Sequence, residues 1–588
     1  MNGRGGVVTF FLFLFLSIVI LLQIHSMLQS DRFYEALNRL DETFSTGHLT
    51  VENITPIYNG KDERETTASR DEEYPGDEGD WLIWAFRVEP KTLNQINVDS
   101  DIYSRWITIP NIFEPLLAYD YDQIKLKPWL ADSFEVSNDG MEITFRLRDD
   151  IHFSDGKPIT TDDVVFTYET IINPLVDGSN VAQQFIDVDR VVKIDERTVK
   201  FYMKRPYFKS LQISSLTWDV GIYPKHIYKF DDAEQFNKRV SNPIGSGPYV
   251  FEKWDVGSRI VLRRNENYWG RKPKLKKIVY KFITNASACL QSLRSGQVDV
   301  MIPTPEQFAD IVEDVEFNKE FRCLSYWTPW TPFFYMGWNQ DTVFFKDKRV
   351  RLAMTHTVNR QHIVKYLLKG YGRMISSSFY INGPENNPDI EPWNWDLERA
   401  RELLDEAGWV DTDGDGLRDK GGVPFRFKFT YSADSDLYNR LAKLFKDDAA
   451  KVGIDVIPDP YEWSVLMPKL SDREFEAMVM GWGGDILEDP YQIFHSSQIG
   501  NRACNYIGFS NAQADVLMEE ARRTIDEDKR IRLFHQLHSI LHEEQPYTFL
   551  FTRPTFRLVD RRFKNVKIHK LGLKYLEWYV PKSEQRYK

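Results

Sequence analysis

The chain has 588 residues, of which 42% are hydrophobic and 28% are charged, and this balance excludes a disordered chain and one that mostly fills a membrane. The formal net charge is −12, and no basic stripe is interleaved with aromatic residues, so nucleic acid is not expected as a partner. The length suffices for several domains. Aromatic residues reach 14%, which indicates either a large core or a wide ligand cavity lined by rings.

The first predicted element is an apolar segment at the N-terminus. Residues 7–22 are almost all apolar and follow Arg4, which is the pattern of an export signal. No small-x-small cleavage site follows closely, and the apolar stretch 7–28 has the length of about 20 residues that a spanning helix needs. Arg4 places the N-terminus in the cytoplasm. We therefore predict a signal anchor within residues 1–30, with a cleaved signal peptide as the alternative, and the rest of the chain lies outside the cytoplasm in both cases.

Residues 31–80 do not have the pattern of a folded domain. Residues 31–40 suit a short juxtamembrane helix, and residues 60–80 are charged and rich in turn formers, which predicts a flexible linker. Folded structure is expected to begin at Trp81, where a β-rich run starts.

After Trp81, strand and helix patterns follow one another without a clean repeat. Alternating apolar residues predict a hairpin arm over 142–153, and strands are also predicted over 259–265 and 277–283. Amphipathic periodicity and capping residues predict helices over 162–172, 347–368, 395–408 and 528–546. This mixed order predicts an α/β fold with more than one lobe.

The stretch from Leu126 to Glu169 is the most specific part of the sequence. It contains Pro-x-Leu-Ala, an Asp-Gly turn, the run L-R-x-x-x-x-F-x-D-G and a helix that begins with Asp-Val. This order resembles the signature of the family 5 extracellular solute-binding proteins, the peptide- and nickel-binding receptors of ABC importers. Further segments match in the family's order, namely residues 90–94, 112–117, 243–254, 265–270, 293–300, 345–360 and 481–490.

The resemblance implies a two-lobed periplasmic-binding-protein fold of type II, in the class with an additional middle domain. The implied division is a first lobe from 81–110, 226–330 and 552–588, an additional domain from 111–225 and a second lobe from 331–551. The chain would cross between the lobes near residues 326–339 and 546–554. Both are strand-like aromatic runs, as expected beside a ligand cleft.

The resemblance also implies a ligand contact. In the peptide receptors of this family, an Asp that follows a Gly-Trp pair binds the ligand's α-ammonium group, and Asp485 in the run 481–485 matches that pattern. A carboxylate in a dry cleft pairs strongly with an ammonium group, and Gly483 and Gly484 would let a ligand backbone approach as an added strand. The candidate aromatic contacts are Trp330, Tyr335, Trp338 and Trp482, for which hinge packing is the alternative explanation.

These features predict the extracytoplasmic substrate-binding component of an ABC importer, which captures short peptides between its lobes and delivers them to a membrane permease. We expect a monomer that needs no cofactor. The alternatives are the same type of receptor for an oligosaccharide or a nickel complex, or a ligand sensor without a permease. An enzyme is not expected, because the chain has no G-x-S-x-G elbow and no zinc-protease motif.

Possible metal ligands occur in two places. Residues 411–419 resemble an EF-hand calcium loop, but Gly422 stands where a bidentate Glu is needed. Three histidines in 535–542 share a helix face but flank an apolar stripe, so we predict no metal there. The cysteines match no zinc or redox motif, which leaves open either free thiols or one bridge between Cys289 and Cys323.

Overall fold

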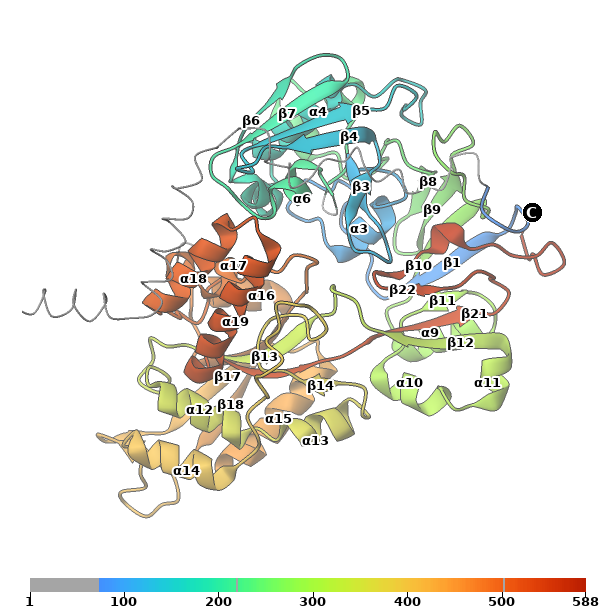
Figure 1. Ribbon diagram of the computed structural model, residues 1–588. Coiled ribbons are helices and arrows are strands. Elements are labelled where there is room, and N and C mark those ends of the chain that lie inside the picture. Colours follow the sequence, from blue (N-terminus) through green and yellow to red (C-terminus); the bar gives the residue numbers. More distant parts are fainter. Residues whose placement is uncertain (1–72, 218–219, 501–502, 588) are drawn as a thin grey trace, which may run out of the picture. The chain divides into compact units, whose positions relative to one another are not determined.

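The computed structural model describes residues 73–217, 220–500 and 503–587 (Figure 1). The predicted signal anchor within residues 1–30, the juxtamembrane helix and the linker as far as residue 72 lie outside the described residues. In the part of the chain that is described, no helix is both long enough and apolar enough to cross a membrane.

Three larger β-sheets and the helices around them give a mixed α/β fold, as the sequence predicts. The seven-stranded sheet has the order β12-β21-β11-β1-β10-β9-β8. Its strands are β1 (Trp81–Phe86), β8 (Tyr249–Asp255), β9 (Arg259–Arg264), β10 (Lys277–Phe282), β11 (Val300–Met301), β12 (Phe321–Tyr326) and β21 (Thr555–Asp560). Strands β1 and β10 are parallel. Towards one edge of the sheet β10 pairs with β9 in antiparallel fashion, and towards the other edge β11 pairs with β21 in antiparallel fashion.

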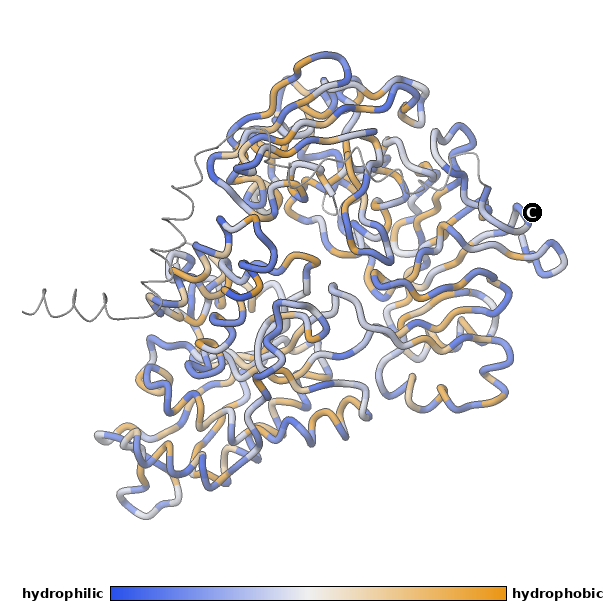
Figure 2. The backbone as a smooth tube through the Cα atoms, viewed as in Figure 1, coloured by the Kyte–Doolittle hydropathy of each residue, from blue (hydrophilic) through white to orange (hydrophobic). Residues whose placement is uncertain are grey.

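The six-stranded sheet has the order β14-β20-β13-β19-β17-β18. Its strands are β13 (Phe333–Trp338), β14 (Arg373–Met374), β17 (Arg426–Ser432), β18 (Asp455–Tyr461), β19 (Ala477–Trp482) and β20 (Tyr547–Thr552). Every residue of β13 and β20 is buried, so this pair forms the centre of the core around the sheet. Figure 2 shows hydrophobic residues along the sheet strands and hydrophilic residues in the loops between them.

The four-stranded sheet is antiparallel and has the order β4-β5-β7-β6 (cyan and teal in Figure 1). Its strands are β4 (Ala131–Val136), β5 (Glu142–Leu147), β6 (Val188–Lys193) and β7 (Thr198–Met203). The predicted hairpin arm over 142–153 is confirmed over Glu142–Leu147, where β5 pairs with β4 in a hairpin, but the strand is shorter than predicted and only His152 beyond it forms a bridge, with Pro158. Gly140, at φ +69°, closes the β4–β5 turn that the Asp-Gly pair predicts.

Helices lie between and beside these strands. The longer ones are α4 (Thr161–Ile172), α9 (Ala286–Arg294), α12 (Lys348–Thr357), α14 (Leu397–Glu406), α15 (Asp436–Ala450), α16 (Trp463–Ser471), α18 (Ala512–Arg523) and α19 (Glu527–Glu544). The shorter ones used below are α6 (Ser210–Ser214), α10 (Pro305–Ile311), α13 (Arg360–His362) and α17 (Tyr491–Phe494). The predicted helices over 162–172, 395–408 and 528–546 are confirmed to within a few residues.

The predicted helix over 347–368 is not continuous. Helix α12 ends at Thr357 because Val358 is extended, with φ −79° and ψ 115°. The side chain of Asn359 then accepts a hydrogen bond from the backbone N–H of His362 and starts α13, which runs into a π-helical turn at Ile363–Leu367. An Asn side chain competes for backbone N–H groups in this way, so it starts a new helix more readily than it continues an old one.

Two short segments connect the six-stranded and seven-stranded sheets. Residues 327–332 join β12 to β13, and residues 553–554 join β20 to β21. The strands that these segments join are paired in both sheets, β12 with β21 and β13 with β20. The division into two lobes and a middle domain stays a prediction.

Three of the sequence motifs meet at one buried carboxylate, Glu114. Its Oε1 accepts hydrogen bonds from Trp129 Nε1 at 2.9 Å and Tyr268 Oη at 2.6 Å, and its Oε2 accepts one from Trp269 Nε1 at 2.8 Å. Burial raises the pKa of Glu114, although these hydrogen bonds oppose the shift. The motif segments 112–117, 126–131 and 265–270 therefore act in packing.

The end of the predicted linker belongs to the folded body. Asp80 is completely buried and forms an ion pair with Arg562, and its carboxylate accepts hydrogen bonds from the backbone N–H groups of Arg586 and Tyr587. Asp77 and Glu78 also accept hydrogen bonds from Lys582 and Gln585, and Glu73 pairs with Lys274, so the part of the predicted linker that the structure describes, residues 73–80, packs against the folded body.

Candidate functional site

The loop that carries Asp485 follows strand β19 directly. Gly484 fixes how this loop packs against the segment that joins β12 to β13. A Cβ atom on Gly484 would lie 2.0 Å from the carbonyl oxygen of Pro329, whereas one on Gly483 would meet nothing within 4 Å. Glycine is therefore required at position 484 by a close backbone approach, and Gly483 is exposed.

Asp485 is paired within the chain. Its Oδ2 lies 2.7 Å from Nζ of Lys209, and its Oδ1 accepts a hydrogen bond from its neighbour's backbone, Ile486 N–H, at 2.7 Å. Gln212 Nε2 also donates to Oδ1, at 3.4 Å. The Lys209 side chain is 13% exposed and that of Asp485 is 36% exposed, so the ion pair is partly shielded from water.

The charges around this pair compensate one another. Burial alone would lower the pKa of Lys209, but Asp485, Tyr207 and Asp489 outweigh it and raise that pKa, so the ammonium form is kept. Burial raises the pKa of Glu488 well above its usual value, and the nearby Asp485 adds to the shift. The neutral form of Glu488 is thereby favoured.

The same loop has a second charged contact. Asp489 Oδ2 accepts a hydrogen bond from Tyr207 Oη at 2.7 Å and lies 3.1 Å from Nε of Arg522. Phe208 N–H donates to the Arg522 carbonyl oxygen at 2.9 Å. Residues 207–212, which lie between β7 and the end of α6, therefore contact the loop after β19 and helix α18 at several points.

The predicted aromatic contacts separate into two groups. Trp482 is partly exposed and stacks on Tyr506, with ring centroids 6.0 Å apart, and Trp330 is also partly exposed. Tyr335 is completely buried and stacks on Tyr547, and Trp338 is completely buried with its Nε1 donating to Thr548. In this structure Tyr335 and Trp338 are core residues, which the packing alternative predicts.

Sequence reasoning missed the residues that contact Asp485. Lys209 and Gln212 are separated from it by more than 270 positions and lie in no recognised motif. The pattern around 205–215 marks only a short helix, so no signal in the sequence indicates this contact.

The charged cavity on the six-stranded sheet is separate from this loop. Its volume is about 310 Å³, and its lining includes Lys428, Asp459, Lys469 and Glu476. Both signs of charge are present, and Asp485 and its partners are not among the lining residues. The cavity therefore adds nothing to the site around Asp485.

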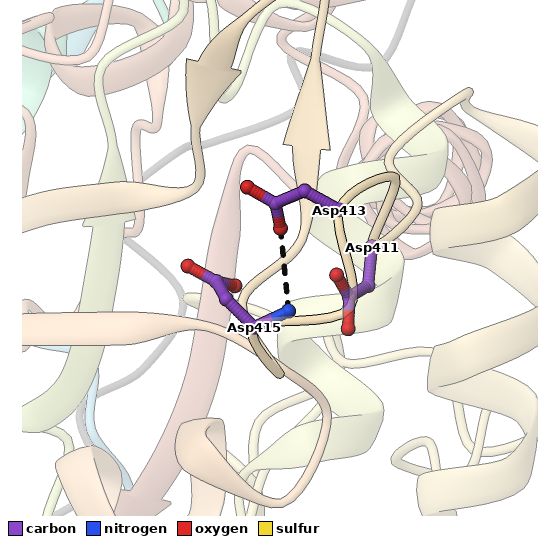
Figure 3. A group of neighbouring side chains, drawn as sticks. All are labelled: Asp411, Asp413 and Asp415. Atoms are coloured by element: carbon purple, nitrogen blue, oxygen red, sulfur yellow. Dashed lines mark hydrogen bonds between the residues drawn. The ribbon is translucent and has the colours of Figure 1, made fainter.

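The acidic loop of residues 411–419 brings three carboxylates together (Figure 3). One oxygen from each of Asp411, Asp413 and Asp415 lies within 4.8 Å of the others, and all three residues are exposed. Asp411 accepts hydrogen bonds from the N–H groups of Gly414 and Gly416, and Asp413 accepts one from Asp415. These hydrogen bonds hold the turns of the loop, and they account for the positions of the three carboxylates without a metal. Exposed acidic groups are also common where no metal binds.

The histidines of α19 have separate partners. Nε2 of His535 lies 2.9 Å from the Pro384 carbonyl oxygen, and the ring of His542 stacks on Trp393. His538 lies between Ser376 and the backbone of Asn387. All three cysteines of the chain lie in the described part and are free thiols.

Comparisons with known proteins agree on one family. The family model for bacterial extracellular solute-binding proteins, family 5 middle, matches residues 125–502. The oligopeptide-binding protein AppA of Bacillus subtilis is 30% identical over 534 residues, covering 89% of this chain and 95% of AppA. The structure of AppA from Bacillus subtilis with a nonapeptide matches with a TM-score of 0.75 and 28% identity, over 86% of this chain and 100% of that chain. NikZ from Campylobacter jejuni with Ni(L-His) matches with a TM-score of 0.72 and 25% identity, over 84% of this chain and 99% of that chain.

Proposed function

Because the chain belongs to the bacterial extracellular solute-binding proteins of family 5, we propose that it is the extracytoplasmic substrate-binding component of an ABC importer and captures short peptides. It binds its ligand without transforming it and delivers it to a membrane permease. The strongest support is the similarity to the oligopeptide-binding protein AppA, whose structure holds a nonapeptide, over most of this chain and nearly all of AppA.

The proposal includes a two-lobed architecture of type II. The seven-stranded sheet would form the first lobe and the six-stranded sheet the second, with the four-stranded sheet as the additional middle domain. Support comes from the two short connections, residues 327–332 and 553–554, because few covalent links leave the two sheets free to close on a ligand. The chain acts as a monomer on the outer face of the cytoplasmic membrane, anchored by residues 7–28.

We propose that the ligand contacts lie at the loop after β19. Asp485 binds the ligand's α-ammonium group, Gly483 and Gly484 receive its backbone, and Trp482 and Trp330 contact its side chains. The exposure of Gly483 and the partial exposure of Trp482 and Asp485 support this assignment. The buried rings of Tyr335 and Trp338 support the loop from within the core.

A nickel complex is the second candidate, favoured by the similarity to NikZ with Ni(L-His). Isothermal titration calorimetry on the purified chain tests both, with peptides of two to nine residues in one series and Ni²⁺ with L-histidine in the other. Mass spectrometry of the natively purified protein reports any ligand that co-purifies. We expect saturable binding of peptides. Binding of the nickel complex alone, or of neither series, would contradict peptide capture.

A further inference from the structure

The ammonium group of Lys209 lies where the proposed function places the ammonium group of a ligand. Lys209 Nζ is 2.7 Å from Oδ2 of Asp485, which is an ordinary distance for a charge-assisted hydrogen bond. The lysine comes from the segment after β7, so a distant part of the chain supplies the partner. Only 13% of its side chain is exposed, and its position is therefore set by packing.

The remaining acceptor capacity of Asp485 is small. The two oxygens of a carboxylate offer about four lone-pair positions in total. Three donors already use them, since Ile486 N–H and Gln212 Nε2 point to Oδ1 and Lys209 points to Oδ2. A second ammonium group would have to share the carboxylate with Lys209.

Electrostatics opposes such sharing. Asp485 and Lys209 form a pair with no net charge, and Asp489 is likewise matched by Arg522. A ligand ammonium beside the carboxylate would be attracted by Asp485 and repelled by Lys209, and this repulsion offsets part of the attraction. The full attraction is regained only when Lys209 moves away.

We propose that Lys209 is a specificity-determining residue that competes with the α-ammonium group of the ligand for Asp485. This inference rests on the proposed function. Peptides with a free N-terminus have to displace Lys209, whereas ligands with a blocked N-terminus leave the pair in place. Lys209 thereby reduces the advantage that a free N-terminus would otherwise have.

A purely structural role is the alternative explanation for Lys209. Its segment has other contacts to the same region, namely the hydrogen bond from Tyr207 to Asp489 and that from Phe208 N–H to the carbonyl oxygen of Arg522. Phe208 also lies under the guanidinium of Arg530, 4.7 Å from it. Loss of the Lys209 charge therefore leaves this interface several contacts, and the variant is expected to fold.

The test uses Lys209→Met, which keeps an unbranched side chain one atom shorter than lysine and removes its charge. Lys209→Arg keeps the charge, and Lys200→Met is the matched control. Lys200 lies on β7 in the same part of the chain and pairs with Glu142 at 3.0 Å, on the four-stranded sheet. Calorimetry measures the affinity of each protein for a peptide with a free N-terminus and for the same peptide acetylated there. Thermal unfolding monitors the fold.

We expect Lys209→Met to bind the free peptide at least about tenfold more tightly than the unsubstituted protein, which equals about 1.4 kcal/mol. Affinity for the acetylated peptide stays within about twofold, and Lys209→Arg and Lys200→Met resemble the unsubstituted protein. Equal changes for both peptides, or no change, overturn the competition while peptide capture stands. If the unsubstituted protein binds neither peptide, the proposed function fails and this inference fails with it.

Discussion

His538 is a buried histidine with both ring nitrogens engaged, and it makes the stability of the fold depend on pH. Asn387 N–H donates to Nδ1 at 3.1 Å, so Nε2 carries the proton and donates to Ser376 Oγ at 3.0 Å. Burial, together with the nearby His542 and His535, lowers the pKa of His538 to about 4. The neutral ring is thus the form that the fold accepts.

The direction of the pH effect follows from this lowered pKa. Between pH 6.5 and 4 the unfolded chain binds a proton at this position and the folded chain does not, so acid favours unfolding. The stabilisation is fully present above pH 6.5 and is lost as the pH falls towards 4. For His538 alone we expect a loss of about 2 kcal/mol between pH 7 and pH 5.

Urea unfolding at pH 7, 6 and 5 checks this prediction. His538→Asn keeps an acceptor for Asn387 N–H and cannot be protonated, so its unfolding free energy should change less with pH than that of the unsubstituted protein. His535→Asn, on the same helix, is the control and should retain most of the original dependence, because His535 is a smaller cause of the lowered pKa than burial and His542. An unchanged pH dependence in His538→Asn would contradict the assignment.

At the scale of elements, alanine substitution of two adjacent glycines is expected to affect the stability of the fold differently. Gly484→Ala places a methyl group against the carbonyl oxygen of Pro329, so the loop after β19 has to shift from the segment that joins β12 to β13. We expect a loss of about 1–3 kcal/mol in unfolding free energy and weaker peptide binding. Gly483→Ala has free space around its Cβ position and should leave stability within about 0.5 kcal/mol.

Urea unfolding and calorimetry on both variants separate these expectations. Because Gly483 is a proposed ligand contact, weaker peptide binding by Gly483→Ala agrees with the prediction, whereas a less stable fold contradicts it. Equal stability of the two variants would show that the loop does not depend on the approach to Pro329.

The elements were predictable wherever local pattern decides the structure. Apolar, β-rich runs placed β1, β9 and β10, and capping residues placed α4, α14 and α19. The sequence pattern did not predict the helix break at Asn359, because the apolar periodicity continues through this residue, whose side chain starts a new helix. It also could not distinguish Trp338, which is in the core, from Trp482, which is partly exposed, because both follow Met-Gly at the end of an apolar, strand-like run.

At the scale of the whole molecule, the contacts that matter join segments far apart in the chain. The sequence motifs locate Glu114, Trp129 and Trp269 separately, but only the fold shows that they meet. The contact of Lys209 with Asp485 has no signal at all in the sequence. One-sequence reasoning therefore reached the family and the loop that carries Asp485, and it missed the charge that faces this carboxylate.

A second long-range ion pair links helices beside the two larger sheets. Arg440 on α15 lies 2.8 Å from Glu306 on α10, and each side chain is 38% exposed. Burial alone would raise the pKa of Glu306, but its hydrogen bonds, including the one from Arg440, lower it overall. Since, among the described residues, the chain passes between the two sheets only at 327–332 and 553–554, this pair is well placed to favour the conformation in which α10 and α15 meet.

If ligand binding draws the two sheets together, Arg440→Met should weaken that conformation and hence binding. The expected loss is about two- to fivefold in affinity, the range of a partly exposed ion pair, and it should be equal for free and acetylated peptides. This uniform loss contrasts with the selective gain expected for Lys209→Met. Calorimetry on Arg440→Met, Glu306→Gln and the double variant measures the coupling, with Arg401→Met as a control because Arg401 pairs with Glu398 within α14. Additive effects of the two substitutions would mean that the pair does not contribute to closure.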